Sequence, residues 1–159
     1  MLIRFTKAKR ADKRDVLTCV HDDGTSTWMV ERPGFVQHDL AHYAVETTFG
    51  YRLGFFGLVA HGWEFEHMGT IDPATGKKRA LPDEPESPGV EYVVSLLQRE
   101  RTGLLRPEDF YDALAMYCAA IPSQFTDERL ALARGEIERL YRRWDEVPAG
   151  GSLELRFAR

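Results

Sequence analysis

The sequence predicts an α+β fold in which a small antiparallel sheet packs against about five helices. Strand-like alternation marks residues 2–31, helical patterns fill the middle of the chain, and alternation returns at 152–157. Because strands and helices are segregated rather than alternating, the parallel-sheet nucleotide-binding folds are disfavoured. We expect residues 1–159 to form a single α+β domain.

Three strand-like segments precede the first helical pattern. Residues 2–6 alternate between apolar and polar side chains, and the segments DVLTCVH and STWMVE flank the turn signal Asp22-Asp23-Gly24. Such a pair of segments around a turn predicts a β-hairpin. The segment SLELRF alternates in the same way near the end of the chain, and we expect it to join the N-terminal sheet as a final strand.

Five segments carry helical signals. The first runs from about Gln37 to Phe49 and ends at Gly50, and the second covers LGFFGLVAHGW, residues 53–63. Three more begin at Ser87-Pro88, at Arg106-Pro107 and at Thr126; the last of these extends to about Asp145. Residues 68–88 are rich in glycine, proline and mixed charge without periodicity, which predicts a long exposed loop.

Composition excludes several classes of function. The formal net charge of −4 argues against a nucleic-acid-binding protein, because neutralising phosphates requires a basic face. The longest apolar stretches fall far short of the roughly 20 residues that cross a bilayer, and MLIRFTKAKR reverses the order of a secretory signal. We therefore expect a cytoplasmic protein that binds neither nucleic acid nor membrane. No GxGxxG, P-loop or GxSxG pattern occurs, so no nucleotide cofactor is expected.

Histidine and carboxylate side chains gather in one region. Between Pro33 and Gly76 there is only one basic side chain, Arg52, yet four of the five histidines lie there. Side chains in this stretch that accept protons or bind cations are His38, Asp39, His42, Glu46, His61, Glu64, Glu66, His67 and Asp72.

Helix geometry places three of these side chains in one stripe. Successive helical residues rotate by about 100° and rise 1.5 Å, so His38, His42 and Glu46 follow one another about 6 Å apart along the axis. Two histidines at positions i and i+4 can converge on one metal ion. Glu46 lies about 12 Å along the axis from His38, so it is expected to orient His42 or to pair with Arg52.

The segment His38-Asp39-Leu40-Ala41-His42 resembles the HExxH helix of zinc metallopeptidases, with aspartate in place of the general-base glutamate and without a downstream HxxGxxH. The resemblance implies that His38 and His42 are metal ligands, that Asp39 is a candidate catalytic base, and that His61, Glu64 or His67 supplies the third ligand. The wider segment, with its HDLxHYxxE helix, also resembles a family of small uncharacterised bacterial proteins, which implies no activity.

Two functional hypotheses follow. In the first, the chain binds zinc or another divalent metal and is a small metal-dependent hydrolase of unknown substrate, with Asp39 and Glu46 as candidate catalytic residues. In the second, it is a non-catalytic interaction or regulatory module that works through a homodimer or a partner. The cluster also has a purely structural interpretation, in which Asp39 interacts with the helix dipole and His42 hydrogen-bonds Glu46.

Overall fold

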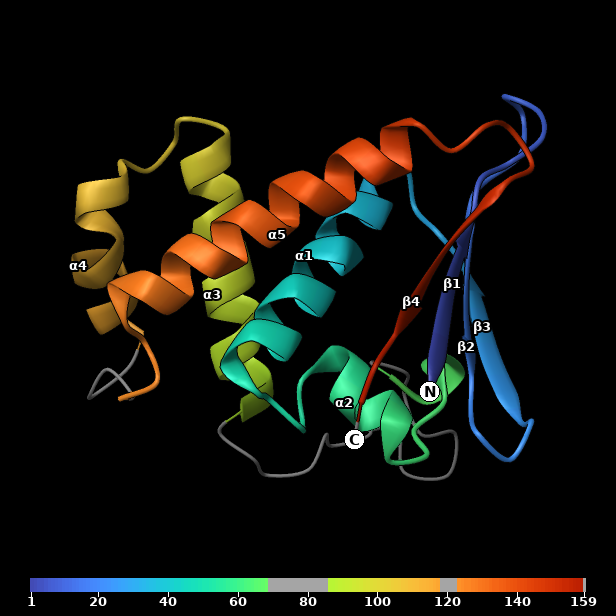
Figure 1. Ribbon diagram of the computed structural model, residues 1–159, viewed down its shortest axis with the longest axis horizontal. Helices are drawn as coiled ribbons and strands as arrows, with labels where there is room; N and C mark the ends of the chain where they lie inside the picture. Colours follow the sequence, from blue (N-terminus) through green and yellow to red (C-terminus); the bar gives the residue numbers. More distant parts are fainter. Residues whose placement is uncertain (69–85, 118–122, 159) are drawn as a thin grey trace, which may run out of the picture.

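The computed structural model describes residues 1–68, 86–117 and 123–158, and it confirms the α+β class (Figure 1). Four strands, β1 (Leu2–Thr6), β2 (Val16–Val20), β3 (Ser26–Val30) and β4 (Ser152–Arg156), form one sheet. The described residues also contain five α-helices and two short 3-10 helices. The helices are α1 (Phe35–Phe49), α2 (Phe55–Ala60), α3 (Glu86–Arg101), α4 (Phe110–Ala115) and α5 (Asp127–Asp145), with η1 (Phe65–His67) and η2 (Pro107–Asp109).

The sheet is antiparallel, in the order β3-β2-β1-β4. The last strand pairs with the first, Ile3 opposite Leu155, which confirms that the C-terminal segment joins the N-terminal sheet. Side chains alternate between the two faces, and Ile3, Phe5, Leu17 and Leu155 point into the core. The helices cover this inner face, while the other face has no helix against it in Figure 1.

Helix α1 is the central helix of the fold. It packs against both α3 and α5, and it also contacts α2 (Figure 1). Its apolar side, with Leu40, Ala41, Ala44 and Val45, is buried as the helical pattern predicts. Because neighbours surround the helix, the polar side chains of Asp39, His42 and Glu46 are buried as well, and this part of its polar side does not lie in open solvent.

The boundaries of the helices differ in detail from those predicted. Gly50 ends α1 with a φ of 73°, as expected for a residue in the left-handed region, but α1 begins at Phe35, two residues early. Helix α2 is shorter than predicted. Thr126 caps α5 by accepting a hydrogen bond from the Arg129 backbone N–H.

Most of the predicted loop at 68–88 lies outside the described residues, and Glu86 already belongs to α3. Over the described parts of the chain, no helix combines the length and the apolar character needed to cross a membrane.

Candidate metal centre

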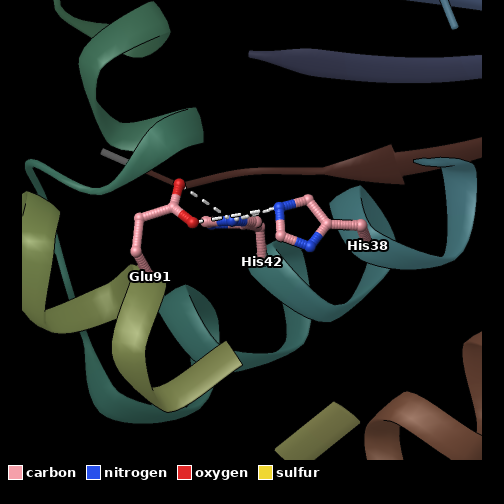
Figure 2. Close-up of side chains that lie close together, drawn as sticks. All are labelled: His38, His42 and Glu91. Atoms are coloured by element: carbon pink, nitrogen blue, oxygen red, sulfur yellow. Dashed lines mark hydrogen bonds and ion pairs between the residues drawn. The ribbon is translucent and has the colours of Figure 1, made fainter. Parts of the chain in front are cut away.

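Three potential metal ligands converge between α1 and α3 (Figure 2). Residues His38 and His42 come from successive turns of α1, and Glu91 comes from α3. The two histidine Nε2 atoms are 3.2 Å apart, and His42 Nε2 lies 3.3 Å from Glu91 Oε1. His38 Nε2 is 3.9 Å from Glu91 Oε2. All three residues therefore present a ligand atom toward one small volume.

These separations fit a divalent cation. Zinc holds nitrogen and carboxylate ligands at about 2.0–2.1 Å, so neighbouring ligand atoms in a tetrahedral site are about 3.3–3.4 Å apart. The distances of 3.2 and 3.3 Å meet this requirement without rearrangement. The third distance, 3.9 Å, is to the other Glu91 oxygen, so binding through a single carboxylate oxygen requires the half-exposed Glu91 side chain to shift.

The outer ring nitrogens of both histidines face oxygen atoms. His38 Nδ1 lies 3.2 Å from Gln98 Oε1, and His42 Nδ1 lies 3.4 Å from Glu46 Oε1. Protons placed on the two Nδ1 atoms therefore leave both Nε2 atoms with lone pairs pointing toward each other. Two lone pairs at 3.2 Å repel unless a proton or a cation lies between them. The arrangement thus favours a positive charge at this point.

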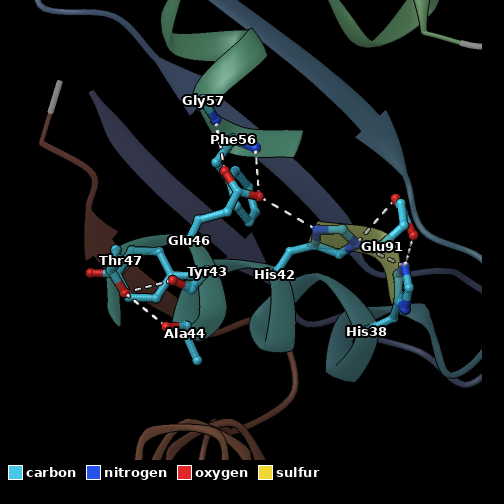
Figure 3. Close-up of polar contacts among 9 residues, drawn as sticks. All are labelled: His38, His42, Tyr43, Ala44, Glu46, Thr47, Phe56, Gly57 and Glu91. Atoms are coloured by element: carbon cyan, nitrogen blue, oxygen red, sulfur yellow. Dashed lines mark hydrogen bonds and ion pairs between the residues drawn. The ribbon is translucent and has the colours of Figure 1, made fainter. Parts of the chain in front are cut away.

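Glu46 is held firmly behind His42 (Figure 3). Its buried carboxylate accepts hydrogen bonds from the backbone N–H groups of Phe56 at 3.2 Å and Gly57 at 2.9 Å, at the start of α2. Gly54 makes room for it, since a Cβ atom at that position would lie 2.5 Å from the Glu46 Cδ atom. Carboxylates in this position orient metal-binding histidines and raise their basicity.

Electrostatics reinforce the preference for a cation. Burial lowers the pKa of His42, but hydrogen bonding to Glu46 and Glu91 outweighs it and raises the pKa to about 9. The hydrogen bond to His42 in turn lowers the pKa of Glu91 below its ordinary value. When no metal is bound, His42 is therefore a buried imidazolium between two carboxylates. A metal ion would replace this proton.

The site opens on the Glu91 side. The side chain of His42 is only 2% exposed, whereas that of Glu91 is 55% exposed. The rings of Phe35 and Phe55 pack against His38 and His42, with centroids 5.6 and 5.5 Å away. These aromatic contacts help to hold the imidazoles in place.

Some of the predicted site residues lie at the candidate centre, and others do not. His38 and His42 meet as predicted, and Glu46 takes the predicted position behind His42. Asp39 instead turns toward Glu31, where both carboxyl groups are buried. The geometry therefore offers no support for Asp39 as a base acting at the His38–His42 pair.

Two of the predicted third ligands, His61 and Glu64, lie elsewhere. His61 and Glu64 line a separate hollow of about 460 Å³ near the β2–β3 turn, and His61 Nδ1 donates to the Gly57 carbonyl oxygen at 2.8 Å. The side chain of His67 falls outside the described parts of the chain. Within the described residues, the group that could hold an ion takes Glu91 in their place.

Sequence reasoning did not find Glu91. In the sequence it follows Val90 and precedes Val93 and Val94, so it has the spacing of an ordinary exposed carboxylate on an amphipathic helix. Nothing in the local pattern distinguishes it from the other charged residues of α3. Only the packing of α3 against α1 brings it to the histidines.

Comparisons with protein-family models, with curated proteins and with solved structures each found no match. The resemblances to zinc metallopeptidases and to a bacterial family therefore stay predictions. Fold and site together define an α+β protein with a candidate centre of two histidines and one carboxylate. Any function must be argued from that centre.

Proposed function

We propose that this protein binds a divalent metal ion through His38 Nε2, His42 Nε2 and a Glu91 carboxylate oxygen, and that it is a small metal-dependent hydrolase. The observation that carries the proposal is the convergence of the three ligand atoms within 4.8 Å of one another. The acceptors already facing the outer ring nitrogens support it, because metal-binding histidines almost always have such partners.

The donor set favours particular metals. Two imidazoles and one carboxylate make up the protein ligands of many catalytic zinc sites, and the same set binds non-haem Fe(II). Three protein ligands leave at least one coordination position for water or substrate. In hydrolysis, the ion would polarise the substrate and lower the pKa of water.

The chain's own residues have separable roles in this proposal. Glu46 holds the orientation of His42 and keeps its Nδ1 protonated, and Gln98 does the same for His38. Glu91 lies at the exposed side, where a substrate would arrive. Asp39 is given no catalytic role, since its carboxyl is buried against Glu31.

The direct test is metal analysis of the full chain purified without an affinity tag, after supplementation with zinc, manganese, nickel or iron. We expect bound metal in the native protein and a metal content lower by one ion per chain in His42→Ala and Glu91→Gln. His61→Ala is the matched control, because His61 is a histidine outside the centre and should not change metal content. An unchanged metal content and melting temperature in His42→Ala would refute the proposal.

The alternative function is an interaction module that acts as a homodimer. The observation in its favour is the outer face of β3, an edge strand on which Trp28 is 62% exposed and Val30 is 51% exposed. An exposed edge strand with apolar side chains can pair with another chain. Light scattering tests this alternative, and a strictly monomeric protein that binds metal would contradict it.

A further inference from the structure

A second acidic group lies beside the candidate metal centre. Glu31 follows β3, and Asp39 belongs to α1, next to His38 in the chain and one helical turn before His42. Glu31 is only 1% exposed and Asp39 only 4% exposed. Both oxygens of Glu31 and the Oδ2 atom of Asp39 lack a hydrogen-bond donor among the described residues. Three buried carboxylate oxygens are thus left unsatisfied.

Among the described residues, no lysine or arginine is one of the charged groups that act on this pair. The charged groups that act on Glu31 are Asp39 and Asp15, both acidic. Burial raises the pKa of Asp39, while a hydrogen bond with Glu31 and the nearby histidines of the first centre act to lower it. Burial, with the Asp39 charge adding to it, raises the pKa of Glu31 to about 9. Ionised carboxylates in such surroundings are stable only with a proton or a cation between them.

We propose that Glu31 and Asp39 form a second cation site, for a hard divalent ion such as Mn²⁺ or Mg²⁺, beside the His38–His42–Glu91 centre. Carboxylate oxygens are the ligands that these ions prefer, whereas the first centre offers mainly imidazole nitrogen. The unsatisfied oxygens of Glu31 and Asp39 are the free ligand atoms of this second site.

The description of a two-ion centre rests on the proposed function, but the second site depends only on its own residues. Asp39 links the two sites, because on a helix its side chain neighbours that of His42 at position i+3. Two adjacent ions stabilise both the attacking and the leaving oxygen in many hydrolytic enzymes. A second ion would therefore add positive charge on the buried side of the first centre, close enough for His38 and His42 to act on Asp39.

The competing occupant is a single proton shared between the two carboxyl groups. The test is the stoichiometry of Mn²⁺ binding to the full chain at pH 8, measured from the paramagnetic signal of the unbound ion. We expect two ions per chain in the native protein, one in Glu31→Gln, and one in His38→Ala/His42→Ala. Glu154→Gln is the matched control and should retain two, because Glu154 pairs with Arg4 in an exposed ion pair.

The outcomes separate the two proposals. If the histidine centre does not bind metal but the second site does, native protein holds one ion, and the double histidine variant keeps it. Two ions in Glu31→Gln, or none in the double histidine variant, would overturn the second site and favour the shared proton. Glu91→Gln removes a half-exposed ligand and serves in place of the histidine variant if that chain does not fold.

A second readout does not depend on counting ions. In the Glu91→Gln protein, Mn²⁺ should raise the melting temperature through the remaining site. The double variant Glu31→Gln/Glu91→Gln should not show this increase. The same increase in melting temperature with and without Glu31 would contradict the assignment, whatever the number of bound ions.

Discussion

Metal binding at the first centre should be strongly pH-dependent, because it competes with the His42 proton. The test changes the pH from 7 to 9 and measures metal affinity in the Glu31→Gln protein. This substitution is used because it removes the Glu31 carboxyl group, whose proton would otherwise be released in the same pH range. The pKa of His42 is raised to about 9. At pH 7 only about 1% of the chains then have neutral His42, so the apparent affinity is about 100-fold below its limit.

The sign follows from the direction of the shift. A ligand with a raised pKa holds its proton more tightly, so the apparent metal affinity rises about tenfold per pH unit between 7 and 9 and then levels off. Glu91 adds no proton, because its pKa is lowered and it is ionised throughout this range. Each bound ion should therefore release about one proton at pH 7.

Calorimetry in buffers of different ionisation enthalpy counts the released protons directly. Zn²⁺ is the probe, and the titration is repeated at three pH values between 7 and 9. Proton release near zero at pH 7, with a flat affinity across this range, would refute the argument. It would mean that His42 is neutral without metal and that Glu46 and Glu91 do not sustain an imidazolium there.

Three further predictions concern stability and metal affinity. Glu31→Gln should make the free energy of unfolding of the metal-free protein less dependent on pH. The pKa of Glu31 is raised from 4.5 to about 9, so between these pH values the native protein holds a proton that the unfolded chain does not. This extra proton makes the free energy of unfolding fall by up to about 1.4 kcal/mol per pH unit as pH rises. Urea titrations at pH 6 and 8 should show a shallower slope in Glu31→Gln, with the slope that remains coming from His42, whose pKa is raised from 6.5 to about 9. Glu46→Gln should weaken zinc binding by about 10- to 100-fold in competition with a chelator, because His42 loses the carboxylate that orients it; unchanged affinity would remove Glu46 from the site. Gly54→Ala should destabilise the fold by about 1–3 kcal/mol, because the new Cβ atom meets the Glu46 carboxylate. Gly135→Ala is its control in urea denaturation, since a Cβ atom there has no neighbour within 4 Å and the change should be neutral or stabilising.

Local patterns predicted most of the helices and strands, though not all of their boundaries. Alternation in SLELRF predicted the strand that pairs with β1, and Gly50 marked the end of α1, because both signals depend only on neighbouring residues. The spacing of His38 and His42 predicted their convergence for the same reason, as helix geometry alone puts them on adjacent turns.

Tertiary packing decided the rest. Whether Glu91 is a surface charge or a metal ligand depends on how α3 lies against α1, and no residue near Glu91 in the sequence carries that information. Asp39 has a local pattern that suggests a catalytic base, but the return of the chain from β3 places Glu31 against it. Amino-acid sequence by itself thus determined the elements and the histidine pair. Long-range contacts decided which residue completes the histidine pair and which residues lie against Asp39 and Glu46, because those contacts join residues that are distant in the chain.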